Sequence, residues 1–432
     1  MARLLGLLGF LSVITAVFAE TNYCNATLSC PQEYPCCSSG VCGTGVYCIN
    51  ACNPMFSYSF DACMPLPVCK NSTTTFSNYT SKVVDANTFL GDVSEGDWAY
   101  TGYILDYEDE DSMILAMPKN SGGTVLSSTR SVWYGKVSAR LKTSHLAGVI
   151  TAFIIYSGVA DEIDCEFVGV DLETEQTNFF WQATLNYTNS VNATISSDSF
   201  DNFHTYTIDW QEEYIEWSID GVVSRTLYKN ETYNATSGVY QYPQTPSKID
   251  ISIWPGGNAT NSIGTIEWAG GEIDWNATDI TTYPGYYYMI LDEVNITCYG
   301  PPSGTSINGT SAYVYTSNSS FLQKDIAITD AETSLGSSEG TGLDPDAGVS
   351  SSSSASSSST LSSSSSSSSA SSKKSSSSNS STNTEAATST SGSKSKSAAS
   401  SASGSSSSAN LGSTLGLGNI YVIFSIIFGY LL

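Results

Sequence analysis

The chain has 432 residues, of which 40% are hydrophobic and only 13% are charged. Its 41 acidic residues outnumber its 16 Lys and Arg residues, which gives a formal net charge of -25 at pH 7. Because phosphate binding needs a basic surface, this balance excludes nucleic acid as a partner.

Residues 1–19 have the pattern of a secretory signal peptide. Arg3 precedes an apolar run over residues 4–18, and small residues lie at the expected cleavage position, Ala19. Acceptor sequences for N-glycosylation recur from Asn25 to Asn379, a density that fits an extracellular surface. We therefore expect a secreted glycoprotein.

Residues 20–70 are rich in cysteine. Nine of the eleven cysteines lie between Cys24 and Cys69, and only Cys165 and Cys298 lie elsewhere. In a secreted chain this density predicts a small module held together by disulfides. A metal site is not expected, because the compartment favours disulfides and the chain has only two histidines. We expect no metal and no cofactor.

Residues 76–300 read as one strand after another, without a long helical pattern. Apolar and polar residues alternate over 131–141, 205–210 and 214–219, and Asp220-Gly221 is a strong hairpin signal. Regular short strands over about 220 residues predict an all-β sandwich or barrel as the main domain.

The segment 161–167, with the sequence DEIDCEF, carries the most informative pattern in the chain. In an extended strand successive side chains point to opposite faces, so Glu162, Asp164 and Glu166 share one face. The three apolar residues between and after them share the other face, which fits a core. Cys165 is among these, and we expect it to be a buried, unreactive thiol.

Three carboxylates in a row repel one another and raise at least one pKa. A glycosidase uses such a pattern, because it needs one ionised carboxylate and one protonated carboxylic acid. Along a strand the Cα atoms of Glu162 and Glu166 are about 13 Å apart, and their long side chains can approach the ~5–5.5 Å of a retaining pair. The alternative is an exposed acidic face on an edge strand. An apolar run at 149–155 argues against it, because that run predicts an internal strand.

The C-terminal third of the chain is mostly polar. Residues 301–349 are expected to be a polar extension, and the serine-rich residues 350–409 a disordered, O-mannosylated stalk. Residues 410–432 combine a small-residue site, a spacer and an apolar tail, the order of a glycolipid (GPI) anchor signal in which the tail is removed. Asn410 is the first choice for attachment, with Gly404 and the serines between as alternatives. A plain membrane tail is the other interpretation.

The segment DEIDCEF resembles the ExDxE signature of glycoside hydrolase family 16. Residues 203–210, 253–257 and 264–271 resemble the Crh branch of that family, the fungal cell-wall chitin–glucan transglycosylases. The resemblance covers essentially the whole chain. It implies a β-jelly-roll catalytic domain, chitin as donor, β-1,6- or β-1,3-glucan as acceptor, and a GPI-anchored location at the cell wall or plasma membrane.

The same resemblance implies roles for individual residues. Glu162 is expected to be the nucleophile and Glu166 the proton donor, which also contacts the substrate. Asp164 is expected to assist them by steering their protonation.

Trp254 and Thr265 are the substrate-binding residues that the resemblance implies, and Lys248 is a further candidate because it shares a strand face with Trp254. Two other functions stay open, a simple hydrolase of chitin or β-glucan and a non-catalytic wall lectin or adhesin. The intact acid pattern argues against the lectin, which has no need of a proton donor.

The cysteine-rich segment resembles a hevein-like chitin-binding module, although the stretch after the paired cysteines is one residue short and lacks an aromatic. Only Tyr47 remains as a stacking platform, so we expect weak chitin binding or a structural cap. The partners of Cys52, Cys63, Cys69 and Cys298 stay open, with one bridge expected to join Cys298 to the N-terminal cluster. The resemblance implies the bridges Cys24–Cys37, Cys30–Cys42 and Cys36–Cys48.

Overall fold

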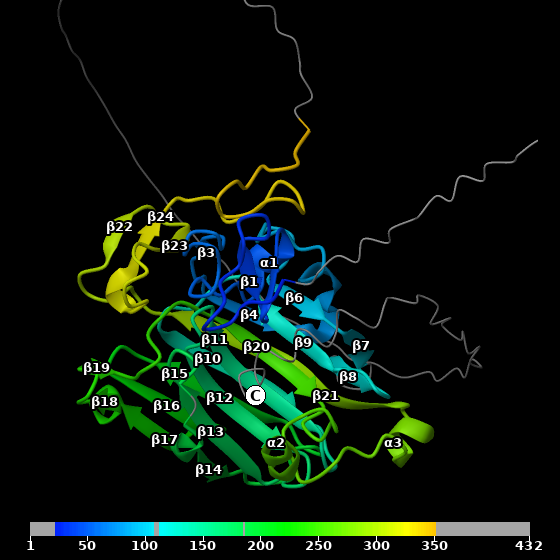
Figure 1. The fold of residues 1–432 in the computed structure, drawn as a ribbon. Helices are drawn as coiled ribbons and strands as arrows, with labels where there is room; N and C mark the ends of the chain where they lie inside the picture. The colour runs from blue at the N-terminus through cyan, green and yellow to red at the C-terminus, as the bar shows by residue number, and fades with distance from the viewer. Residues whose placement is uncertain (1–21, 108–111, 185, 351–432) are drawn as a thin grey trace, which may run out of the picture. The chain divides into compact units, whose positions relative to one another are not determined.

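The structure is a computed structural model that describes residues 22–107, 112–184 and 186–350. These residues form mainly β-strands, and all the elements below belong to one compact unit (Figure 1). The expected signal peptide (1–19), stalk and anchor signal with Asn410 lie outside the described residues. Of the helices in the described part, none is long and apolar enough to cross a membrane. The α-helices are α1 (Val46–Ile49), α2 (Ile263–Trp268) and α3 (Thr278–Thr281).

Two eight-stranded sheets make up most of the fold. The sheet that carries the acid pattern, here called the acid sheet, has the order β14-β13-β12-β11-β20-β9-β6-β5. Nearly all its neighbouring strands are antiparallel, and only β5 and β6 pair in parallel. Its strands are β5 (Val83–Asp85), β6 (Trp98–Thr101), β9 (Thr124–Ser128), β11 (Ile150–Ser157), β12 (Glu162–Val168), β13 (Thr174–Phe180), β14 (Val191–Thr194) and β20 (Ser247–Trp254).

The second sheet has the order β17-β16-β15-β10-β21-β8-β7, with β4 paired to β21. The hairpin predicted at Asp220-Gly221 joins β16 to β17, and both residues have positive φ, 49° and 78°, as a tight two-residue turn requires. Its strands are β4 (Ser72–Thr75), β7 (Tyr103–Tyr107), β8 (Ser112–Pro118), β10 (Gly135–Lys142), β15 (His204–Trp210), β16 (Tyr214–Ile219), β17 (Val222–Tyr228) and β21 (Tyr286–Cys298).

The main hydrophobic core takes side chains from both large sheets. Val137 and Trp210 come from the second sheet, whereas Phe153, Cys165 and Ile251 come from the acid sheet. Strand β10 shows how the sequence produces this arrangement, because alternate residues along it are buried. The all-β sandwich prediction is confirmed.

The cysteine-rich module contains β1 (Cys36–Ser38), β2 (Val41–Gly43) and α1, and five disulfides link the described residues. Three are the pairs that the hevein-like resemblance implies. The fourth joins Cys52 to Cys63, and the fifth joins Cys69 to Cys298 across 229 residues. Cys165 is buried and free. The three bridges named above are Cys24–Cys37, Cys30–Cys42 and Cys36–Cys48.

The residues on either side of the expected 76–300 domain are also folded. Strand β4 precedes residue 76, and residues 301–349 form three strands. One of these strands pairs with β3 at the end of the module (Figure 1). The segment expected as a polar extension therefore forms a sheet together with the end of the module. This four-stranded sheet contains β3 (Leu66–Pro67), β22 (Ser306–Asn308), β23 (Ala312–Tyr315) and β24 (Ile326–Thr329), and a small hairpin contains β18 (Tyr233–Asn234) and β19 (Val239–Tyr240).

Candidate active site

Strand β12 is internal, as the apolar run upstream of it predicts. It pairs antiparallel with β11 on one side and with β13 on the other. Ile163, Cys165 and Phe167 all lie in the main core between the sheets. The alternation of the strand therefore turns the three acids to the outer face of the acid sheet, here called the acid face.

Strand register defines the neighbours of the acids on this face. Phe180, Asn178 and Gln176 of β13 lie opposite Glu162, Asp164 and Glu166 in that order. On the other side, Tyr156 of β11 lies opposite Glu162, and Lys248 of β20 lies opposite Tyr156. The acids are thus flanked by amide, aromatic and charged side chains rather than by a continuous apolar surface.

Burial raises the pKa values of the three acids. Burial raises the pKa of Glu162 well above its usual range, with Asp164 and Glu166 as further causes. Burial also raises the pKa of Glu166, and the neighbouring Asp164 adds to the effect. The pKa of Asp164 is raised to about 7 by burial, against a smaller lowering by Glu162 and Arg225. A raised pKa favours the protonated carboxyl group, which is the form that a proton donor requires.

Hydrogen bonds from residues outside β11, β12 and β13 hold the backbone around the acids in place. The indole nitrogen of Trp217, in the second sheet, donates a hydrogen bond of 3.0 Å to the carbonyl oxygen of Asp164. Just before the strand, the buried carboxylate of Asp161 accepts bonds from the backbone of Gln244 (2.9 Å) and the hydroxyl of Thr245 (2.7 Å). The carboxylate oxygens of Asp164 have no hydrogen bond of ordinary geometry, so only a looser contact relates them to Glu162.

The two substrate-binding residues implied by the resemblance lie at the other end of the acid face. Trp254 ends β20, and its ring stacks on Trp268 with centroids 6.0 Å apart. Thr265 lies in α2, where its hydroxyl is 2.9 Å from that of Ser262, the residue that caps the helix. Both Trp254 and Thr265 are buried.

Trp268 is a site residue to which the sequence analysis gives no role. Its indole nitrogen donates to the amide oxygen of Gln176 at 2.8 Å, and Gln176 lies opposite Glu166. This bond ties α2 to the acid face beside the expected proton donor. Trp268 belongs to the segment 264–271, which the sequence analysis singles out. Its bond to Gln176 joins residues 92 positions apart, and no pattern in the sequence predicts such a bond.

Lys248 and Tyr47 lie where the module meets the acid sheet. The ammonium of Lys248 donates to the carbonyl oxygen of Ile49 in the module, at 3.4 Å. Tyr47 is half-buried, and its ring lies so close to Gly43 that a Cβ there would be 2.4 Å from it. The structure thus places Lys248 far from Trp254 along the same strand, and Tyr47 against the module rather than fully exposed.

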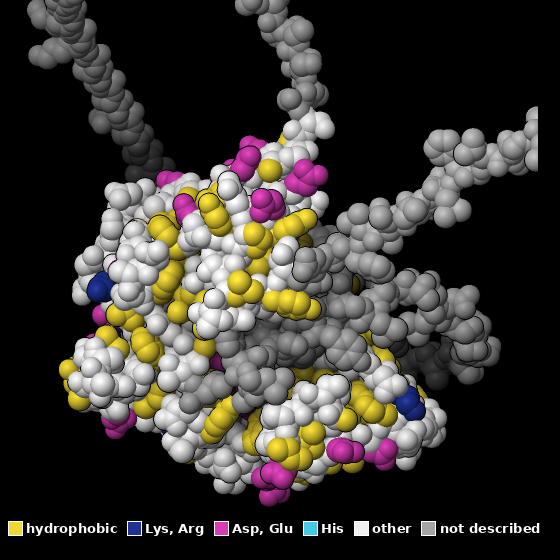
Figure 2. All heavy atoms as spheres, viewed as in Figure 1, with side chains coloured by type: hydrophobic (Ala, Val, Ile, Leu, Met, Phe, Trp, Pro, Cys, Tyr) yellow, Lys and Arg dark blue, Asp and Glu magenta, His cyan; other side chains and the backbone are white. Residues whose placement is uncertain are grey.

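The surface agrees with the net charge. Figure 2 shows acidic side chains in several places on the visible face and only isolated Lys or Arg side chains. In the described part of the chain, the group of metal-ligand side chains close enough to share an ion is Cys24, Cys30 and Cys42. Each of these cysteines belongs to a disulfide, so this group offers no thiolate ligand.

The region that contains these residues is similar to known proteins. A family model described as glycosyl hydrolases family 16 matches residues 93–270. "Congo red hypersensitive protein 2" of Saccharomyces cerevisiae is 66% identical over 348 residues, which cover 80% of this chain and 74% of that protein. "Crh-like protein 2" of Aspergillus fumigatus is 46% identical over 329 residues, covering 76% and 73%. A solved structure, "Crh5 transglycosylase in complex with NAG", is 27% identical with a TM-score of 0.51, and covers 64% of this chain and 99% of its own.

Proposed function

Because the chain belongs to glycosyl hydrolase family 16 and to its Crh group, we propose that it is a transglycosylase that joins chitin to β-glucan in the cell wall. The observation that carries this proposal is the row of three carboxyl groups on the outer face of β12, with the pKa of each raised chiefly by burial. A similar protein of solved structure is described as a transglycosylase with bound NAG, the sugar unit of chitin.

We propose a retaining mechanism. Glu162 attacks the anomeric carbon of the chitin chain while Glu166 protonates the leaving oxygen, which forms a covalent glycosyl-enzyme. Glu166, now ionised, removes the proton from a hydroxyl of the incoming β-glucan, and that hydroxyl displaces Glu162. The proton that left with the first sugar is thus regained in the second step. Asp164, between the two, raises the pKa of Glu166 and so favours the protonated form that acts as proton donor.

The acid face also supplies substrate contacts. Trp254 and Thr265 are proposed to bind the sugar chain at one end of the face, with Trp268 holding α2 in place through Gln176. Lys248 is proposed to contact the chain at the other end. The acceptor is proposed to be a β-1,6- or β-1,3-glucan, whose hydroxyls replace water at Glu166.

The location of the protein follows from the same proposal. Secretion, a GPI anchor with attachment at Asn410, and a serine-rich stalk would hold the enzyme at the plasma membrane or in the wall, where both polymers lie. The module is proposed to add weak chitin binding through Tyr47. Deleting residues 420–432 should release the protein into the medium, because the tail is the signal for anchor attachment.

The test is to incubate the full chain with chitin and a fluorescent β-glucan oligosaccharide. We expect label that stays on the polymer after a denaturing wash, and none with Glu162→Gln. Soluble chitin or glucan fragments without labelled polymer would instead indicate a hydrolase. Label that the denaturant removes, at equal levels for Glu162→Gln, would indicate a lectin.

A further inference from the structure

Arg225 is a half-buried cation on the core side of the sandwich. It lies on β17, the outer strand of the second sheet (Figure 1), directly opposite Trp217 of β16. Trp217 is fully buried in the main core, and directly opposite residues share a face, so Arg225 also points inward. The pairing of β16 with β17 shifts register at this position, and such a bulge re-aims a side chain.

The guanidinium of Arg225 joins the two large sheets. Its Nη1 donates to both the carbonyl oxygen and the hydroxyl of Thr177, each at 2.9 Å. Its Nη2 donates to the carbonyl oxygen of Asn189 at 2.8 Å. The same group lies over the ring of Trp217, 4.5 Å from the centroid. Because Thr177 belongs to β13 and Trp217 to β16, these contacts fix the guanidinium between the sheets.

Two of these contacts lead to Asp164. Thr177 lies opposite Cys165, the residue after Asp164, and neighbouring strands are about 4.8 Å apart. Trp217, on which the guanidinium lies, donates its indole hydrogen bond to the carbonyl oxygen of Asp164. The cation is therefore one strand away from β12 on the core side, while the carboxyl group of Asp164 lies on the acid face.

The charge of Arg225 has no direct carboxylate partner. None of the ion pairs among the described residues involves it. Buried charges are normally paired, because their removal from water is costly. Burial lowers the pKa of Arg225, and Asp164 is the foremost of the groups that oppose this change. In return, Arg225 opposes the rise that burial causes in the pKa of Asp164.

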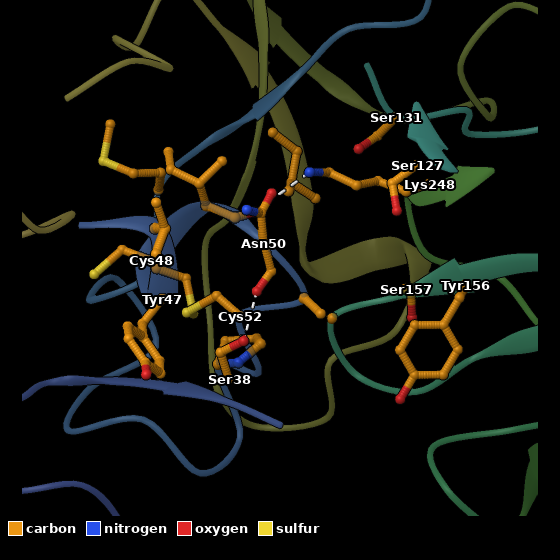
Figure 3. Close-up of a pocket in the computed structure, with 18 of the residues that line it drawn as sticks. Ser38, Tyr47, Cys48, Asn50, Cys52, Ser127, Ser131, Tyr156, Ser157 and Lys248 are labelled. Carbon is orange, nitrogen blue, oxygen red and sulfur yellow. Dashed lines mark hydrogen bonds between the residues drawn. A yellow bond between two sulfur atoms is a disulfide. The ribbon is translucent and has the colours of Figure 1, made fainter. Parts of the chain in front are cut away.

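The other side chains around Asp164 do not supply such a charge. Directly beside it, β11 and β13 present the uncharged Ile154 and Asn178. The ammonium of Lys248, on β20, is held by the carbonyl oxygen of Ile49 in the module (Figure 3). The remaining titratable groups nearby are acids and a thiol: Glu162, Glu166, Asp250, Cys165 and Glu175.

We propose that Arg225 is a positioning residue, whose charge stabilises the ionised form of Asp164 from the core side of the sheet. The inference rests on the proposed function, since it assigns Asp164 a charge state in that mechanism. Ionised Asp164 raises the pKa of Glu166, so a cation in the core helps to keep the proton donor protonated. Arg225 itself lies behind the strand and does not touch the substrate.

The test titrates Asp164 directly, without turnover. The full chain carries isotope-labelled aspartate carboxyl carbons, and the NMR signal that is lost in Asp164→Asn identifies Asp164. Arg225→Met removes the charge and keeps much of the side-chain length, so the titration midpoint of Asp164 should rise by about half a pH unit or more. Arg225→Lys keeps the charge but not the forked hydrogen bonds, and its midpoint should stay near that of the parent.

Two further variants separate charge from packing. Arg225→Gln keeps a donor for Thr177 and should raise the midpoint as Arg225→Met does. Arg140 is the matched control, because it is also an arginine of the second sheet that lies over an aromatic ring, 4.3 Å from the centroid of Phe203. Arg140→Met changes the net charge equally and should leave the midpoint unchanged. Thermal unfolding establishes that each variant is folded.

The outcomes distinguish this inference from the proposed function. If Asp164 titrates alike in the parent and in the neutral Arg225 variants, or if neither neutral variant folds, the inference is overturned. In the transfer assay, the acidic limb of the pH profile of kcat/KM should move to higher pH in Arg225→Met and not in Arg225→Lys. If the parent transfers no label but the midpoint still shifts, the proposed function fails, and the effect of Arg225 on Asp164 stands.

Discussion

Strand β12 and the cysteine-rich module are held in place by different kinds of interaction. The strand is part of a continuous antiparallel ladder whose neighbours, β11 and β13, lie immediately before and after it in the chain. The module depends on links to remote residues, such as the Cys69–Cys298 disulfide and the bond from Gly45 to Gly340. A change in one region should therefore leave the other largely intact.

The two regions are therefore expected to have different roles, one in the chemical step and the other in stability. The alternation of side chains along one strand places the acids of β12 on one face. The burial that raises their pKa values destabilises the fold only around that strand. The module packs on the acid sheet through contacts such as the bond from Lys248 to Ile49, but it supplies no carboxyl group of the acid row. Variants of β12 should remove activity and preserve stability, whereas variants that loosen the module should lower stability and preserve the chemical step.

The largest effect is expected from Glu162→Gln and Glu166→Gln. Because these residues have separate covalent and proton-transfer roles in the proposed mechanism, each change should lower transfer activity on the order of 10³-fold or more. Glutamine keeps the shape and removes a buried ionisable group, so the melting temperature at pH 7 should not fall. Transfer of the fluorescent label and thermal unfolding together measure this. Folded variants that keep most of their turnover would refute the assignment.

Asp164→Asn should have a smaller effect, a loss of about 10²- to 10⁴-fold, which is the range for a positioned proton-handling group. Asn keeps the side-chain shape but cannot exchange a proton with its neighbours. The shape of the pH profile of kcat/KM should therefore change, in addition to the fall in its maximum. A profile that keeps its shape while activity falls would mean that Asp164 only supports the strand.

The acid face could be predicted from sequence because its geometry is local. Period-two alternation over seven residues places Glu162, Asp164 and Glu166 on one face and Cys165 in the core, and the structure shows both. The hairpin at Asp220-Gly221 is similar, since two residues determine the turn.

The position of the module could not be predicted in this way. Cysteine spacing allows many pairings, so the partners of Cys52 and Cys63 stay open from the sequence alone. The docking of the module depends on Leu335 and Gly340, in a segment whose composition indicates only a polar extension. Contacts between segments so far apart in the chain follow no local pattern, so the sequence could not reveal this docking.

Removal of the Cys69–Cys298 disulfide tests whether remote links hold the module. This bridge closes a loop of 229 residues, whereas Cys52–Cys63 closes one of 11. Because loop closure restricts the unfolded chain more when the loop is longer, the double Ala variant of the first pair should lose about 3–5 kcal/mol. The double Ala variant of the second pair should lose less, about 2–3 kcal/mol. Denaturant unfolding measures both, and an equal loss would contradict the comparison. Transfer activity of the folded fraction should persist in each.

The smallest effect concerns Glu175, an acid of β13 on the face opposite the acid row. Its side chain is fully buried, its oxygens lack hydrogen bonds of ordinary geometry, and burial raises its pKa to about 7. The folded state therefore holds this proton more tightly than the unfolded state. As pH rises from about 4.5 to 7 the unfolded chain releases the proton first, so this group lowers stability by up to about 3 kcal/mol.

Glu175→Gln carries no proton to lose and should remove that dependence. In urea unfolding, the variant should match the parent at pH 4 and exceed its stability at pH 8, with transfer activity unchanged because Glu175 lies in the core. Glu272→Gln, at an exposed position, is the control and should behave like the parent at both pH values. A Glu175→Gln variant that is less stable at pH 8 would show that the buried carboxylate has a binding partner that offsets its burial.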